Sequence, residues 1–243
     1  MYQLCIDQGN SSTKIGVFDL NSLIYKTDYK QFGEKEIVEI KNNFQIQSAI
    51  ISSVISDNED LLQLLQLHFQ QFVILNHCTY VPIENNYITP KTLGLDRLAA
   101  IVGAQFLQPE KNLLVIDAGT AITYDFIDKN KVYWGGNIAP GIEMRLKSLH
   151  DYTKKLPLIQ AEPYDELLGN DTKTAILAGV IQGIHFEIIG YINTLKIKYP
   201  ELSIFLTGGS TFYFDTKLKN LIFAEKNLVL IGLNRILNFN VQK

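Results

Sequence analysis

The chain has 243 residues, of which 47% are hydrophobic, 19% charged and 11% aromatic. This apolar share supplies a core for one large or two modest domains and excludes a wholly disordered chain. Its 22 Lys and Arg against 25 Asp and Glu give a formal charge of -3. That balance disfavours general binding to a phosphate backbone, so we expect no nucleic-acid partner.

The two cysteines and the N-terminal residues narrow the class of protein further. Cys5 and Cys78 are too few and too far apart for a disulfide framework or a thiolate zinc site. The opening MYQLCID has no basic region of the kind that begins a signal peptide. No apolar stretch approaches the roughly 18 residues that span a bilayer. We therefore expect a cytoplasmic protein without a membrane partner.

A short motif occurs twice in the chain. Residues 5–9 read CIDQG and residues 115–119 read VIDAG. Three residue types coincide at a shift of 110 positions: Asp7 with Asp117, Gly9 with Gly119, and Thr13 with Thr123. This repeat predicts two related lobes, 1–110 and 111–243, with their boundary near residues 108–112.

Hydrophobic patterning gives the expected elements of the first half. In chain order they are strands at 2–7 and 15–18, an apolar strand at 49–54, a helix within 59–72, a strand at 72–75 and a helix at 96–107.

The second half follows a similar plan. The expected elements are strands at 113–117 and 123–127, a turn at Gly135-Gly136, a helix start near Pro140-Gly141, a helix at 172–199, a strand at 203–206, a strand at 227–231 and a helix at 233–239. Because strands precede helices in each half, we predict an α/β fold of mixed sheets flanked by helices.

The first Asp-x-Gly turn is a candidate phosphate site. Gly9 lets the backbone turn closely enough for N–H groups to approach a phosphate, and Lys14 adds positive charge. Further donors follow Asp7 in the chain: Gln8, Asn10, Ser11, Ser12 and Thr13. Asp7 itself would hold a Mg²⁺ through water or orient a hydroxyl. Taken alone, a simple hairpin with an Asp-Gly turn is the better interpretation.

Two further turns change that weighting. The second Asp-x-Gly is followed by Thr120, and Thr207-Gly208-Gly209 follows a predicted buried strand. Neither a GxxxxGK[ST] loop nor a GxGxxG motif is present. The ordered set of three turns favours an ATP site of the type found in actin, Hsp70 and sugar kinases.

The segment 87–97, YITPKTLGLDR, is the candidate acceptor-substrate site. Asp96 could simply cap a helix that begins at Arg97, which is the better interpretation of an isolated Asp. The same pair could form a catalytic corner, in which Asp96 accepts a proton from a substrate hydroxyl and Arg97 binds an anionic group.

Taken in order, these motifs resemble the type III pantothenate kinases. The segments that carry the resemblance are DQGNSSTK (7–14), YITPKTLGLDR (87–97), DAGTAITYD (117–125), GGNIAPG (135–141), GNDTKTAILAGVIQG (169–183), TGG (207–209) and NLVLIGLNRIL (227–237). The resemblance implies an actin-like, duplicated ribonuclease H-like fold of two lobes with an ATP cleft between them. It also implies phosphorylation of pantothenate to 4′-phosphopantothenate, the first step of coenzyme A biosynthesis.

The resemblance implies roles by position. It assigns ATP binding to Asp7, Gln8, Gly9, Asn10, Ser11, Ser12, Thr13, Lys14 and Thr120. It assigns pantothenate binding to Tyr87, Gly94, Leu95, Asp96, Arg97 and Thr172, with Asp96 as the proton acceptor. Asp117 matches a monovalent-cation ligand, which implies K⁺ or NH₄⁺ alongside Mg²⁺ and ATP. A homodimer is implied as well.

Other interpretations stay open from the residues alone. Thr172 could cap its helix, and Gly135-Gly136 could be only a hairpin turn. The chain could be another kinase of the same superfamily that acts on a sugar or polyol, or a nucleotide-binding regulator that transfers no phosphate.

Overall fold

The computed structural model describes residues 2–10, 12–55, 58–213 and 221–241. Its contacts divide the chain into two compact units. The first comprises Met1–Glu110, Asn130–Trp134 and Asn227–Lys243, and the second Lys111–Lys129 and Gly135–Lys226. The predicted lobe boundary at residue 110 stays a prediction, and each unit is described by itself.

The first unit is built on a five-stranded sheet of order β3-β2-β1-β4-β5. Its strands are β1 (Tyr2–Gln8), β2 (Thr13–Asp19), β3 (Ser22–Tyr29), β4 (Ile46–Ser53) and β5 (Gln71–Ile74). Its helices are α1 (Glu34–Asn43), α2 (Glu59–His68), α3 (Leu95–Leu107) and α7 (Leu228–Val241), with a short 3₁₀ turn η1 (Pro90–Thr92). β1 is antiparallel to β2 and parallel to β4.

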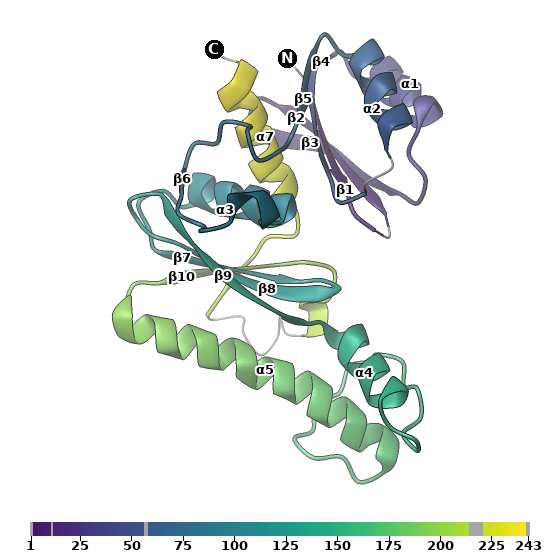
Figure 1. Cartoon of the computed structure of the whole chain (residues 1–243), viewed down its shortest axis with the longest axis vertical. Helices are drawn as coiled ribbons and strands as arrows, with labels where there is room; N and C mark the ends of the chain where they lie inside the picture. The colour runs from purple at the N-terminus through teal and green to yellow at the C-terminus, as the bar shows by residue number, and fades with distance from the viewer. Residues whose placement is uncertain (1, 11, 56–57, 214–220, 242–243) are drawn as a thin grey trace. The chain divides into compact units, whose positions relative to one another are not determined.

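Alternation along β1 decides which way Asp7 faces. Leu4 and Ile6 join a core cluster with side chains of α1 and α2. Gln3, on the opposite face, donates from Nε2 to Asn238 Oδ1 of α7 at 2.7 Å. Figure 1 shows the strands between α1 and α2 on one side and α7 on the other. Because strand side chains alternate, Asp7 lies on the face that α7 covers.

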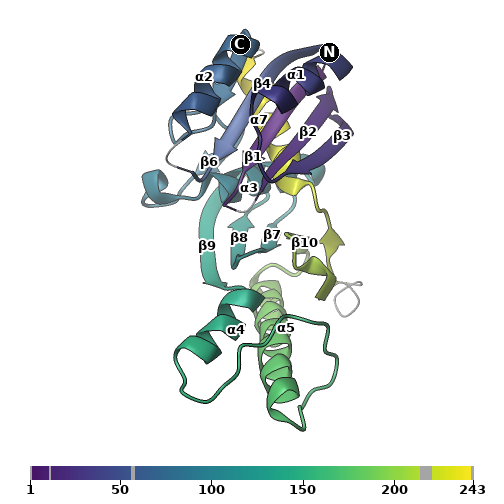
Figure 2. The same cartoon turned by 90° about the vertical axis from the view of Figure 1, so that its right-hand side faces the viewer.

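The second unit repeats this strand order. Its elements are β7 (Leu113–Ala118), β8 (Ala121–Ile127), the part of β9 (Val132–Pro140) from Gly135 onward, β10 (Ser203–Thr207), β11 (Phe223–Ala224), α4 (Ile142–Asp151), α5 (Thr172–Lys198) and a 3₁₀ turn η2 (Thr211–Tyr213). The order β9-β8-β7-β10-β11 matches β3-β2-β1-β4-β5, and the first residues of β9 also pair with β6 (Glu84–Asn85). Figure 2 shows α4 and α5 on one side of this sheet. The predicted mixed sheets flanked by helices are confirmed.

Helix α5 corrects the expectation that no apolar stretch approaches the length needed to span a bilayer. Among the described residues it is the one helix that is long and apolar enough, by length and composition, to cross a membrane. Half of its most apolar window is buried inside the protein, and residues from Ile176 to Ile192 join the core cluster of the second unit. About half of its apolar character is therefore that of a core helix.

Two element predictions are wrong. Gly135 and Gly136 lie inside β9 instead of a turn. A Cβ on Gly136 would lie 1.9 Å from Tyr124 O, so glycine is required there by a close approach of β8. Residues 228–231 begin helix α7 instead of forming a strand. This helix is apolar on most of its circumference, so its sequence shows no period that separates helix from strand.

Candidate active site

The first phosphate turn is the hairpin that joins β1 to β2. Gly9 N donates to Ser12 O at 3.0 Å, which closes the turn. Gln8 Oε1 accepts from Ser53 Oγ at 2.7 Å and from Asn58 Nδ2 at 3.2 Å, so this predicted ATP residue anchors the turn to β4. Asn10 is exposed, Ser12 is partly buried, Thr13 is buried in β2, and Ser11 lies outside the described residues.

Asp7 is held in an environment that penalises its charge. Its side chain is 13% exposed, and its Oδ2 lies 4.0 Å from Lys14 Nζ. Burial raises the pKa of the Asp7 carboxyl from 3.8 to about 6; Lys14 lowers this pKa, while Asp96 raises it. The mutual repulsion places Asp96 within electrostatic range of the first phosphate turn. The fold thus brings together two predicted site residues that are 89 positions apart in sequence.

This pKa gives a prediction about stability. Because the folded chain favours protonated Asp7, folding becomes less favourable as pH rises from about 4 through 6. Asp7→Asn removes that penalty. We expect its gain in the free energy of unfolding over the parent to be about 2 kcal/mol larger at pH 7.5 than at pH 4.5. Urea unfolding at the two pH values measures it, with Asp60→Asn as an exposed control. An equal gain at both values would contradict the buried-charge interpretation.

Asp96 lies in the first turn of α3. Gly94 is the N-cap and the helix begins at Leu95. The alternative in which Asp96 is the N-cap of a helix that starts at Arg97 is therefore wrong. Asp96 Oδ1 accepts from Arg97 N at 2.8 Å. A Cβ on Gly94 would lie 2.6 Å from the same oxygen. The absence of a side chain at Gly94 therefore makes room for the Asp96 carboxylate.

Arg97 lies beside two tyrosine rings. Its side chain is 6% exposed, and its guanidinium carbon lies 5.8 Å from the centroid of the Tyr87 ring. Arg97 Nη2 donates to Tyr133 Oη at 3.3 Å, and the Tyr87 and Tyr133 rings stack with centroids 6.2 Å apart. The structure thus brings the predicted residues Tyr87 and Arg97 together. The sequence does not predict Tyr133 as a site residue, because it lies outside every motif quoted above.

The second and third turns are neighbours within the second unit. β7 and β10 are parallel and pair Asp117 with Thr207, so the turns that follow these strands lie at one edge of the sheet. Ser210 N donates to Ala118 O at 2.9 Å. Gly208 has a φ of +99°, and a Cβ there would lie 2.5 Å from Asp117 Oδ1. Glycine is required at this position both by its backbone conformation and by the Asp117 carboxylate.

The donor set suits hard cations held partly by phosphate. No group of three His, Cys, Asp or Glu side chains that could hold a metal ion occurs within the described part of the chain. Asp117 instead presents one half-buried carboxylate against the backbone of Gly208 and close to Gly119. Carboxylate and carbonyl oxygens are ligands for K⁺ and Mg²⁺, and Mg²⁺ commonly completes its shell with water and substrate phosphates. Asp117 therefore offers one carboxylate of the type that hard cations accept as a ligand.

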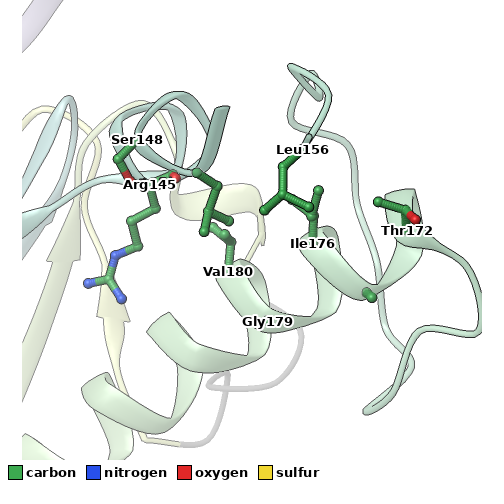
Figure 3. A pocket seen from close by; sticks show the side chains of 9 residues that line it. Arg145, Ser148, Leu156, Thr172, Ile176, Gly179 and Val180 are labelled. Atoms are coloured by element: carbon green, nitrogen blue, oxygen red, sulfur yellow. Dashed lines mark hydrogen bonds between the residues drawn. The ribbon is translucent and has the colours of Figure 1, made fainter. Parts of the chain in front are cut away.

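Thr172 is the first residue of α5, not its cap. Asp171 Oδ1 accepts from Thr174 N at 2.8 Å and is the N-cap, so the capping alternative for Thr172 is wrong. Thr172 is exposed and lines a pocket of about 650 Å³ between α4 and α5. Figure 3 shows Thr172 and Arg145 at opposite ends of this pocket, with apolar side chains between them.

Solved structures define the class of fold. A Campylobacter jejuni protein described as a Baf family transcriptional activator superposes with a TM-score of 0.63 at 23% identity, covering 99% of this chain and 100% of that one. The inorganic polyphosphate/ATP-glucomannokinase of Arthrobacter sp. strain KM superposes with a TM-score of 0.52 at 13% identity, covering 98% and 99%. The fold is that of the actin-like ATPases and sugar kinases, as the sequence predicts.

Comparison of sequences identifies the family, which the likeness to solved structures does not. The family model described as type III pantothenate kinase matches residues 3–194. A protein of Bacteroides fragilis (strain YCH46) named type III pantothenate kinase is 48% identical over 237 residues, 98% of each chain. The chain belongs to the type III pantothenate kinase family, which confirms the predicted resemblance.

Proposed function

We propose that this kinase transfers the γ-phosphoryl group of ATP to pantothenate, giving 4′-phosphopantothenate for coenzyme A biosynthesis. Family membership supports the reaction and ATP as co-substrate. The structural observation that carries the proposal is the Asp96–Arg97 corner of α3, whose carboxylate acts electrostatically on Asp7 of the first phosphate turn. The proposed proton acceptor is thus on the same unit as the turn that we propose to bind phosphate.

In the proposed step, Asp96 accepts the proton of the primary hydroxyl of pantothenate. The hydroxyl oxygen forms a bond to the γ-phosphorus, the bond from that phosphorus to the β–γ bridging oxygen breaks, and ADP leaves. Arg97 and Tyr87 bind the acceptor together with Gly94, Leu95 and Thr172. Phosphoryl transfer depends mainly on positioning and charge stabilisation, so these contacts are as important as proton removal.

The turns hold the nucleotide in this proposal. Backbone N–H groups of the turn at residues 7–14 and the hydroxyl of Thr120 bind phosphate oxygens. Lys14 supplies positive charge beside Asp7. Asp117 would hold K⁺ or NH₄⁺, and Mg²⁺, when bound, would offset the charge of the ATP phosphates.

We also propose a cytoplasmic homodimer that pairs through α5. Its face includes Phe186, which is 57% exposed, the exposed glycines at 179 and 190, and the partly buried Gly183; at all three glycines a Cβ would meet nothing within 4 Å. Their spacing places them along one face of the helix. Small residues on an apolar face allow close helix approach. Light scattering tests the dimer, and a monomer at assay concentration would reject it.

A coupled assay of ADP release tests the function. We expect turnover with pantothenate, Mg²⁺-ATP and K⁺, and a large loss of turnover when Na⁺ replaces K⁺. Phosphorylation of a hexose but not of pantothenate would reject the proposed substrate. ATP binding without transfer to either acceptor would instead favour a regulator.

A further inference from the structure

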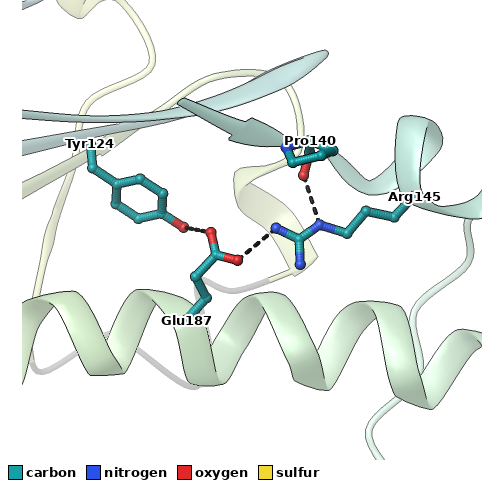
Figure 4. Close-up of polar contacts among 4 residues, drawn as sticks. All are labelled: Tyr124, Pro140, Arg145 and Glu187. Atoms are coloured by element: carbon teal, nitrogen blue, oxygen red, sulfur yellow. Dashed lines mark hydrogen bonds and ion pairs between the residues drawn. The ribbon is translucent and has the colours of Figure 1, made fainter. Parts of the chain in front are cut away.

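A chain of polar contacts crosses the second unit from its sheet to α4. Figure 4 shows Tyr124 of β8, Glu187 of α5 and Arg145 of α4 in line. Tyr124 Oη donates to Glu187 Oε1 at 2.7 Å, and Arg145 Nη2 donates to Glu187 Oε2 at 2.7 Å. Arg145 Nε donates to Pro140 O at 2.7 Å. Each donor of the chain thus has an acceptor at short distance.

This series of polar contacts, which runs from Tyr124 to Pro140, ends next to the turn that carries Thr120. Gly141 follows Pro140, and Gly141 N donates to Thr120 O at 3.0 Å. A Cβ on Gly141 would lie 2.4 Å from both Gly119 O and Thr120 O. The backbone of this turn therefore rests directly on Pro140-Gly141, and whatever fixes Pro140 also fixes the turn.

Glu187 holds Arg145 in the orientation that reaches Pro140. The Glu187 side chain is 27% exposed and that of Arg145 22%, so the pair is largely shielded from water. The guanidinium donates one short bond to the Glu187 carboxylate and another to Pro140 O, and these two bonds together fix the orientation of its plane. Burial, followed by the bond to Glu187, raises the pKa of Tyr124, so its hydroxyl stays a donor to Glu187.

We propose that Glu187 is a positioning residue for the nucleotide. Through Arg145 it fixes Pro140-Gly141, and through them the turn of Thr120. Glu187 itself touches no substrate. The inference rests on the proposed function, which assigns Thr120 to ATP.

The test compares Glu187→Ala and Glu187→Gln with the parent chain. We expect Glu187→Ala to raise the KM for ATP about tenfold, as expected for loss of a charge-assisted hydrogen bond that orders the site. Glu187→Gln keeps an acceptor for Arg145, so we expect a rise of about threefold. The KM for pantothenate stays within about twofold in both variants. Neither the acceptor segment at residues 87–97 nor Thr172, which lies at the opposite end of its pocket from Arg145, belongs to this series of contacts. Calorimetry of ATP binding gives the same order of affinities without turnover.

Glu162→Gln is the matched control, because it removes an ion pair of similar length, 2.8 Å to Lys173, in the same unit. We expect both KM values to stay at the parent level in this control. If Glu187→Ala does not fold, Glu187→Gln carries the comparison. An unchanged KM and Kd for ATP in folded Glu187 variants would overturn the inference, as would an equal rise of both KM values. A parent chain that binds ATP but does not phosphorylate pantothenate would reject the proposed function alone, and calorimetry would still decide the role of Glu187.

Discussion

Asp96→Asn is expected to lower kcat about 100-fold or more while the chain stays folded. Asparagine keeps the size of the side chain and an oxygen that accepts from Arg97 N, a contact of 2.8 Å in the parent. It cannot take the proton of the acceptor hydroxyl, and general-base catalysis contributes about 10²- to 10⁴-fold. We place the effect near the lower end, because phosphoryl transfer depends chiefly on positioning. The KM for pantothenate should change only a few-fold, since the binding contacts remain.

Asp60→Asn is the matched control for this substitution. Asp60 also lies in the first turn of a helix, α2, and it is exposed. Both variants therefore lose one negative charge at a helix N-terminus, and only Asp96→Asn loses the proposed base. Steady-state kinetics and thermal unfolding separate the two effects. A kcat within threefold of the parent in folded Asp96→Asn would reject Asp96 as the proton acceptor.

Much of the site could be predicted because its residues follow strand ends. The turns after β1, β7 and β10 each contain glycine next to polar residues, and each follows an apolar run. Repetition of Asp-x-Gly at a shift of 110 residues predicts two related lobes, and the structure adds that the two sheets share one strand order. Local patterns of this kind are visible in sequence because the strand period and the glycine requirement act over a few residues.

The contacts that sequence could not predict join distant segments. Tyr133 reaches Arg97 across 36 positions, and Glu187 reaches Arg145 across 42. Neither pair belongs to a motif, since the tertiary fold alone determines which polar groups meet. The strand predicted at 227–231 is wrong for a related reason. Burial against α3 and the sheet favours apolar residues on most sides of α7, so the helical period is lost.

The close crossing of α3 and α7 predicts a large loss of folding stability in Gly232→Ala. A Cβ on Gly232 would lie 1.8 Å from Ala99 O, and one on Gly103 would lie 2.4 Å from Leu228 O. Both obstacles are backbone atoms, which cannot rotate away as a side chain would. Gly232→Ala must therefore separate the two helices. Overpacking costs about 1 to 3 kcal/mol and occasionally more, and we expect a loss near or above the upper value despite alanine's better helix propensity.

The control is Asn42→Ala, at an exposed position within helix α1. There the helix propensity acts alone, and we expect a gain of up to about 1 kcal/mol in the free energy of unfolding. Urea unfolding measures both variants. Because Asp96 and Arg97 lie at the N-terminus of α3, displacement of this helix should also lower kcat in Gly232→Ala below the unfolding midpoint. Equal stability of Gly232→Ala and the parent would show that the helices can separate at no cost, and would remove the close crossing as the support of the Asp96–Arg97 corner.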